Sequence, residues 1–142
     1  MTVRRRLAGA IIAATLGGAT ALAIPASANA AGHYIGTDGA EARCNASPYL
    51  LCLYYSTFSS AYWGTSGNDT NLGDNHFFSG TGSGAGQVVR NNAARMHCDY
   101  YVPNQCFSYY NTNYGGNYDW EYWHDIGTLY FTWNDEASVK IT

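Results

Sequence analysis

Basic residues are scarce in this chain outside its first few positions. Three of its seven Lys and Arg residues are the adjacent Arg4, Arg5 and Arg6. From Ala31 onward, four basic residues stand against ten acidic ones, a net charge of −6. Proteins that bind nucleic acid need clustered Lys and Arg to neutralise phosphates. The deficit therefore argues against a nucleic-acid-binding protein.

The sequence also lacks the short motifs of common hydrolases and metal sites. H-E-x-x-H, G-x-S-x-G, G-x-x-x-x-G-K and C-x-x-C are all absent. An acidic stretch, D-W-E-Y-W-H-D over 119–125, would alternate along a strand, and we expect its acids to lie on a solvated face rather than in a catalytic pair. We expect no enzyme activity. The histidines are scattered, and each is interpreted as structural or exposed: His33, His76, His97 and His124.

One apolar run stands out, from Leu7 to Ile24, after the three arginines and before Ala28-Asn29-Ala30. A basic start, a short apolar middle and an A-x-A end predict a secretory signal peptide over 1–30, removed after Ala30. The alternative is a membrane anchor, which the Ala, Gly and Thr content and Pro25 disfavour. We expect a secreted, extracellular protein without membrane contact once the signal is removed.

The four cysteines all follow the predicted signal, and an oxidising compartment favours two disulfides. Three pairings are possible. Seven residues separate Cys44 from Cys52, and seven separate Cys98 from Cys106, so we prefer these two short loops. Metal binding is the rival interpretation, and the spacing disfavours it.

Aliphatic residues are few after Ala31, while 22 aromatic residues are present, so aromatic packing must supply much of the core. The remaining length corresponds to one domain. Strands are predicted at 50–56, 107–111, 117–123 and 128–133, because these segments are rich in Tyr, Trp, Phe and Thr and are separated by turn sequences. The pattern predicts an all-β sandwich or barrel.

An internal repeat follows the cysteine pairs. C-L-Y-Y from Cys52 is similar to C-F-S-Y-Y from Cys106, an offset of 55 residues for the aligned tyrosines, and N-N-A-A-R from Asn91 is similar to N-D-E-A-S from Asn134, an offset of 43. Two copies in one order predict two similar units, 44–97 and 98–142, after an N-terminal segment 31–43.

These motifs, with Y-Y-N-T-N-Y-G-G and V-V-R-N-N-A-A, resemble those of the secreted actinobacterial peptidase-inhibitor family typified by the Streptomyces metalloproteinase inhibitor. The resemblance extends from Cys44 to the end of the chain. It implies a βγ-crystallin-like sandwich of two Greek-key motifs. A glycine such as Gly115 or Gly116 is then expected at positive φ in the hairpin of the second copy, called the second hairpin below.

The resemblance also implies an inhibitor of extracellular, thermolysin-like proteases that docks a disulfide-closed loop in the protease cleft. By position, the contact residues are Cys98, Asp99, Tyr100, Tyr101 and Val102. The alternative is that this disulfide only staples a small domain.

Calcium is a second implication, because βγ-crystallin domains bind it through N/D-N/D-x-x-S/T-S. Asn134, Asp135 and Ser138 fit this motif, whereas the Asn91 corner places Arg95 where a hydroxyl belongs. The alternative function is thus a non-inhibitory, calcium- or carbohydrate-binding extracellular module. We expect a monomer with no obligatory cofactor.

Overall fold

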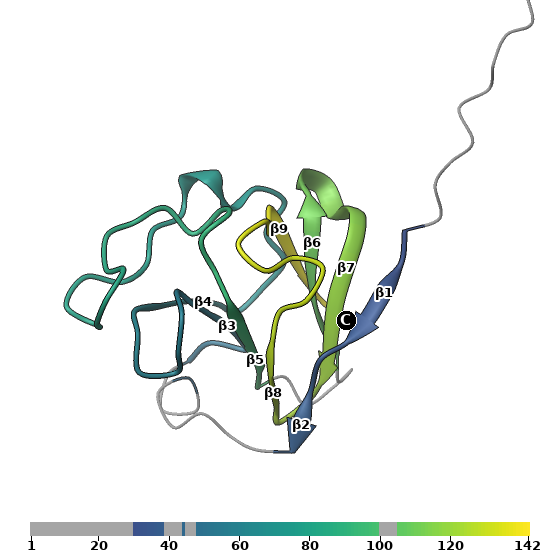
Figure 1. The fold of residues 1–142 in the computed structure, drawn as a ribbon, viewed down its shortest axis with the longest axis horizontal. Coiled ribbons are helices and arrows are strands. Elements are labelled where there is room, and N and C mark those ends of the chain that lie inside the picture. The colour runs from purple at the N-terminus through teal and green to yellow at the C-terminus, as the bar shows by residue number, and fades with distance from the viewer. Residues whose placement is uncertain (1–29, 39–43, 45–47, 100–104) are drawn as a thin grey trace, which may run out of the picture.

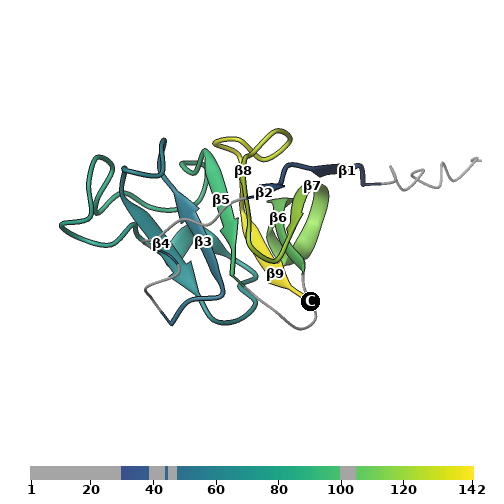
Figure 2. The same ribbon diagram turned by 90° about the horizontal axis from the view of Figure 1, so that it is seen from below.

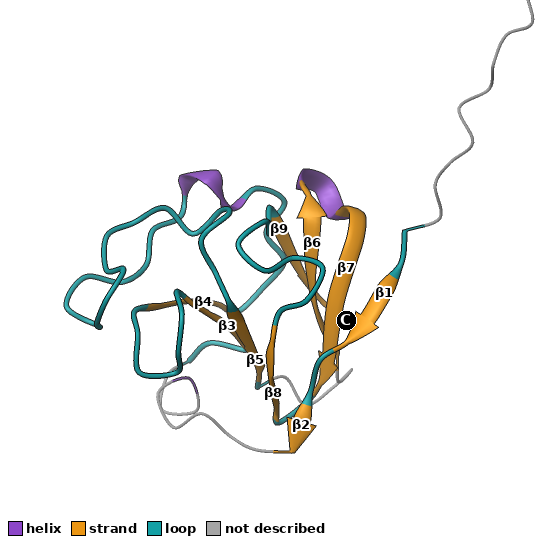
Figure 3. Cartoon of the chain, viewed as in Figure 1, coloured by secondary structure: helices purple, strands orange, loops and turns teal. Residues whose placement is uncertain are grey.

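The computed structural model describes residues 30–38, 44, 48–99 and 105–142 (Figure 1). Within these residues, no helix reaches seven residues, which confirms the all-β prediction (Figure 3). The described elements are β1 Gly32–Tyr34, β2 Thr37–Asp38, β3 Leu51–Tyr54, β4 Tyr62–Thr65, η1 Leu72–Asp74, β5 Arg95–Cys98, β6 Gln105–Asn111, η2 Thr112–Tyr114, β7 Gly115–Tyr122, β8 Asp125–Thr128 and β9 Ser138–Ile141.

The strands form two sheets that pack against each other (Figures 1 and 2). Sheet A has the order β1-β7-β6-β9 and sheet B the order β2-β8-β5-β3-β4. All pairings are antiparallel except that of β1 with β7, which is parallel. The core between the sheets uses the few aliphatic residues, including Leu51, Leu53, Leu72, Met96 and Val139, each fully buried.

Each half of the sequence contributes to both sheets. β8 follows β7 in the chain but pairs with β5 in sheet B, beside β3 and β4. In return, Asp69 from the first half pairs with Val139 of β9 in sheet A. The two halves therefore interlock, through a whole strand in sheet B and through a single β-bridge to β9 of sheet A.

The segments that the sequence aligns at an offset of 43 residues share their backbone geometry. Asn91 (φ 60°) and Asn134 (φ 55°) both adopt the left-handed conformation, and each lies four residues before the strand that closes its half, β5 or β9. Gly116 has a φ of 77°, which confirms the expected positive-φ glycine in the second hairpin.

The strand predicted at 128–133 is wrong. β8 ends at Thr128, and the following residues form bends and turns. Their aromatic and Thr content is typical of a strand, but the backbone N–H groups of Tyr130, Phe131 and Thr132 bond to a side chain rather than to a neighbouring strand. A tertiary contact thus overrides local propensity here.

The preferred disulfide pairing is confirmed, with bonds between Cys44 and Cys52 and between Cys98 and Cys106. The second bond joins the end of β5 in sheet B to β6 in sheet A. On the side of sheet B away from the core, Cys44, Cys52 and Tyr54 form a second small cluster.

Candidate functional site

Strand β7 faces the opposite way from the prediction. Asp119 and Glu121 are fully buried, whereas Tyr118 and Trp120 are partly exposed and Tyr122 is 42% exposed. The expectation that the acids of 119–125 form a solvated face is therefore wrong. Outward positions of a sheet usually carry polar residues and inward positions apolar ones, so this strand is inverted.

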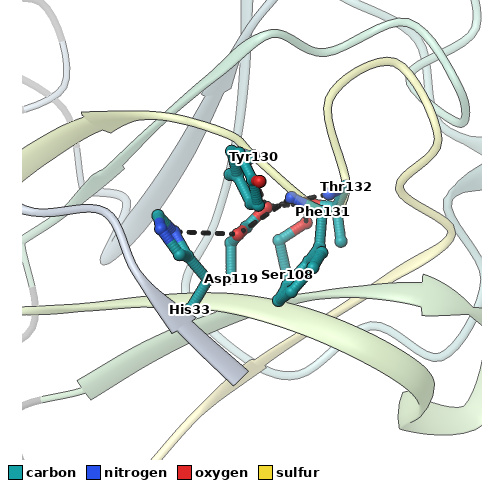
Figure 4. Close-up of polar contacts among 6 residues, drawn as sticks. All are labelled: His33, Ser108, Asp119, Tyr130, Phe131 and Thr132. Carbon is teal, nitrogen blue, oxygen red and sulfur yellow. Dashed lines mark hydrogen bonds and ion pairs between the residues drawn. The ribbon is translucent and has the colours of Figure 1, made fainter. Parts of the chain in front are cut away.

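The buried Asp119 carboxylate organises the turn after β8 (Figure 4). Its Oδ2 accepts hydrogen bonds from the backbone N–H groups of Tyr130 (2.9 Å) and Thr132 (2.8 Å) and from the Thr132 hydroxyl (2.8 Å). Its Oδ1 accepts from Phe131 N (3.2 Å). The Thr132 hydroxyl also contacts Ser108 Oγ (3.0 Å), which ties the turn to β6. These bonds satisfy the buried negative charge.

His33 of β1 lies beside the same carboxylate (Figure 4). Its Nδ1 is 3.8 Å from Asp119 Oδ1, and its ring stacks on that of Tyr130 with centroids 4.4 Å apart. Both rings line a cleft of about 560 Å³ beside sheet B, together with Phe58 and Arg95. Among the described residues, no serine or cysteine lines this cleft to act as a nucleophile. The contact between His33 and Asp119 therefore resembles the histidine–aspartate pair of a catalytic triad that lacks its nucleophile.

Two further acids of the 119–125 stretch are buried, Glu121 of β7 and Asp125 of β8. Asp125 Oδ2 accepts from the Tyr34 hydroxyl (2.6 Å) and from Tyr122 N (3.2 Å). Neither oxygen of Glu121 accepts a hydrogen bond of good geometry within the described residues. Burial, reinforced by Asp125 and Asp119, raises the pKa of Glu121 well above its usual range, and the Cys98 backbone offsets only part of the rise. Burial and the two neighbouring acids thus favour the protonated form of the Glu121 carboxyl.

Strands β1 and β2 lie against Asp125, because the Tyr34 hydroxyl donates to its carboxyl and Asp38 is its partner in the sheet. The connection between them passes so close to β8 that a side chain at Gly36 would overlap the Asp125 carboxyl, and one at Gly127 would overlap the backbone of Ile35. The two glycines thus permit the close approach that seals the end of the core.

The outward side of sheet A forms an aromatic face. Trp120 lies 5.0 Å from Tyr122 and 4.9 Å from Tyr34 between ring centroids. Phe107 is the cross-strand partner of Trp120, and its ring lies 5.8 Å from Tyr118. The aromatic face comprises Tyr34, Phe107, Tyr109, Tyr114, Tyr118, Trp120 and Tyr122.

The predicted protease-contact loop is only partly described. Cys98 is fully buried, and Asp99 follows it with its backbone N–H donating to Leu50 O (2.8 Å). Asp99 Oδ1 lies 3.7 Å from His124 Nε2, and burial raises the pKa of the Asp99 carboxyl while His124 opposes the rise. The other predicted contact residues, Tyr100, Tyr101 and Val102, lie outside the described residues.

The predicted calcium corner is at the second of the two Asn turns. A cleft of about 460 Å³ brings Asn134 together with Asn91 and Asn92 of the first turn, and Arg95 also lines it. The Ser138 hydroxyl donates to Asn111 O (2.7 Å) and accepts from Tyr114 N (3.0 Å), so it closes the second hairpin. Asp135 is exposed. The cleft thus gathers Asn side chains from both halves, with the Arg95 side chain among them.

The neighbouring Glu136 points inward, away from this corner's surface. Its Oε1 accepts from the backbone N–H groups of Asn92 (2.9 Å) and Ala93 (2.8 Å), so it links the second Asn turn to the first. Burial raises the pKa of Glu136 to about 8, although these backbone bonds favour its ionised form.

His97 is fully buried on β5, and neither ring nitrogen has a hydrogen-bond partner among the described residues. Burial, with a contribution from His124, lowers the pKa of His97 to about 4, so the ring is neutral. Among the residues that the structure describes, no three His, Cys, Asp or Glu residues gather closely enough to bind a metal ion.

The aromatic face is the feature that sequence reasoning missed. The signal was present in Y-D-W-E-Y over 118–122, where aromatic and acidic residues alternate strictly. The usual rule assigned the acids to solvent, and the structure reverses that assignment.

Comparison of the chain with protein-family models, with curated proteins and with solved structures finds no match. Within the residues that the structure describes, no helix has the length and apolarity needed to span a bilayer.

Proposed function

We propose that the chain is secreted and inhibits extracellular peptidases, thermolysin-like metalloproteases first among them, by docking the segment between Cys98 and Cys106 in the protease cleft. The observation that supports this proposal is the anchoring of that segment. Both cysteines are fully buried, and they belong to strands of different sheets. A loop held at both ends loses less conformational entropy when it docks.

The proposal includes export and a βγ-crystallin-like fold of two Greek-key units, 44–97 and 98–142. Two disulfides favour an oxidising compartment. The exchange of segments between the halves, β8 into sheet B and Asp69 beside β9, supports two interlocked units of similar design.

Titration of the purified protein against a panel of thermolysin-like and serine proteases tests the inhibitor proposal. We expect stoichiometric inhibition of at least one metalloprotease, weakened by Tyr101→Ala. Tyr110→Ala is the matched control, because Tyr110 is a 47% exposed tyrosine near the far end of β6. Activity of every protease in the presence of excess protein would contradict the proposal for those classes.

The alternative is a non-inhibitory module that binds calcium or carbohydrate. The cleft that joins Asn134 to Asn91 and Asn92 favours the calcium form, whereas Arg95 in the same cleft opposes a cation. If calcium binds, millimolar CaCl2 should raise the melting temperature through linkage, and Asp135→Asn should reduce that rise. Asp74→Asn, at an exposed acid of η1, is the control. An unchanged melting temperature would count against calcium.

A further inference from the structure

We propose that the aromatic face of sheet A binds the surface of an uncharged, insoluble polysaccharide. This interaction is separate from the protease-contact loop and does not depend on inhibition. It rests on the inversion of β7, on the chemistry of the outward, partly exposed rings and on the near absence of charge among them.

The inversion is the first step. Burying a carboxyl group costs free energy, and exposing an aromatic ring forgoes the gain from its burial. β7 does both, with Asp119 and Glu121 inside and Tyr118, Trp120 and Tyr122 outside. Departures from consistent local patterning are expected at functional sites. The outward rings are therefore best explained by a partner outside the fold.

The chemistry of the rings indicates the partner. Five of the seven are tyrosines, each with an apolar ring and a hydroxyl: Tyr34, Tyr109, Tyr114, Tyr118 and Tyr122. Such side chains suit a binding partner whose surface is partly apolar and partly hydrated. A sugar ring presents C–H groups on its faces and hydroxyls around its edge, so it can stack on the rings and hydrogen-bond to their hydroxyls.

The charge of the face argues against anionic partners. The outward register positions of sheet A carry one charged residue, Lys140 of β9, which lies directly opposite Phe107. Single-stranded nucleic acids also stack on aromatic rings, but they need a groove of basic residues for the phosphates. Anionic membranes require clustered Lys and Arg for the same reason. A neutral polymer matches this face in charge.

The arrangement of the rings indicates an extended ligand. Side chains two residues apart on a strand are separated by about 6.8 Å, so Tyr118, Trp120 and Tyr122 form a row along β7. Phe107 and Tyr109 form a second row along β6, and Tyr34 extends the first onto β1. Trp120 and Tyr122 lie edge-to-face, so the rings on the paired strands form an open, uneven surface rather than a pocket. An open surface fits a polymer better than a single soluble sugar.

Sedimentation of the purified protein with microcrystalline cellulose and with crystalline chitin tests the proposal. We expect binding to at least one of the two polymers, retained in 1 M NaCl because no ion pairs are involved. Trp120→Ala/Tyr122→Ala should weaken binding by at least about tenfold, which corresponds to about 1.4 kcal/mol. Tyr130→Ala/Trp133→Ala is the matched control, because these rings are 65% and 58% exposed but lie in the turn after β8. It should bind like the wild type.

Circular dichroism and melting temperature establish that each variant is folded. If the double variant at 120 and 122 fails to fold, Tyr122→Ser replaces it, since Tyr122 is already 42% exposed. Three outcomes would overturn the proposal: no binding of the wild type to either polymer, equal loss of binding in the control variant, or unchanged binding in the face variant. Analytical ultracentrifugation would also overturn it by revealing a dimer that Trp120→Ala/Tyr122→Ala dissociates, because the face would then be covered by a second copy.

Discussion

Replacement of Asp119 by alanine should remove a large part of the stability of the fold. The Asp119 carboxylate accepts two hydrogen bonds from the fully buried Thr132, through its backbone N–H and its hydroxyl, both at 2.8 Å. Hydrogen bonds to a charged partner contribute about 1.5–3 kcal/mol each. The bonds from Tyr130 and Phe131 are only part-buried, and water can replace the carboxylate there. We therefore expect a loss of about 3–5 kcal/mol in the free energy of unfolding.

Such a loss is large beside a total stability of about 5–15 kcal/mol for a small domain. Urea unfolding followed by tryptophan fluorescence and by circular dichroism measures it. Asp119→Asn is the matched variant. It keeps one acceptor oxygen for the Oδ2 contacts but loses the charge, so about half the effect is expected. A free energy of unfolding for Asp119→Ala within about 1 kcal/mol of the wild type would refute the role assigned to this carboxylate.

Three further outcomes are expected. The folded-state pKa of Glu136 is about 8 against an ordinary value of 4.5. Its contribution to stability is therefore complete below pH 4.5 and declines by about 1.4 kcal/mol per pH unit as the pH rises toward 8. Urea titrations at a series of pH values should show a free energy of unfolding that depends less on pH for Glu136→Gln than for the wild type. Glu121→Met should raise the free energy of unfolding at pH 8 by about 1–3 kcal/mol, whereas Glu136→Met should lower it, because the N–H groups of Asn92 and Ala93 would lose their acceptor; equal shifts in the two variants would contradict this. Reduction with dithiothreitol should cost about 2.5 kcal/mol per disulfide, given a sequence separation of 8 in each loop, and an unchanged urea midpoint in the reduced protein would exclude that contribution.

The sequence predicts the fold class and the disulfide pairing because both depend on local patterns. Equal spacing within each cysteine pair favours short loops, and both bonds are present. The aromatic run at 50–56 contains β3, the run at 107–111 lies within β6, and the run at 117–123 overlaps most of β7. In each case, propensity and tertiary structure agree.

The sequence does not predict which side of β7 faces the core. Alternation with a period of two places 118, 120 and 122 on one face and 119 and 121 on the other, but it is silent about which face is buried. The polarity rule then gives the wrong answer, because Asp119 finds four donors in the turn at 130–132. Those donors lie 11 to 13 residues away in the chain, and no local pattern in the sequence connects them to Asp119. The same contact explains why 128–133 is not a strand.

The two inward acids of β7 differ in a way that bears on what fixes the strand's orientation. Asp119 orders a turn, and so its burial is compensated by hydrogen bonds. Within the described residues, Glu121 accepts no such bonds, and burial raises its pKa well above the usual range. Stability therefore does not require a carboxyl at 121. A one-residue slip of β7 against β6 would expose both acids and bury Tyr118, Trp120 and Tyr122.

That slip would satisfy the polarity rule at 121, yet the observed register keeps the rings outside. The outward position of the rings is explained if the rings are the functional residues. Position 121 then faces inward only because side chains alternate along the strand. Substitutions at the two kinds of position should then have different effects on stability and on binding. Changes at Glu121 should move the urea midpoint and leave polysaccharide binding intact, whereas changes at Trp120 and Tyr122 should weaken binding with a smaller effect on unfolding. Loss of polysaccharide binding in a folded Glu121→Met variant would show that the inward acid, too, serves the surface function.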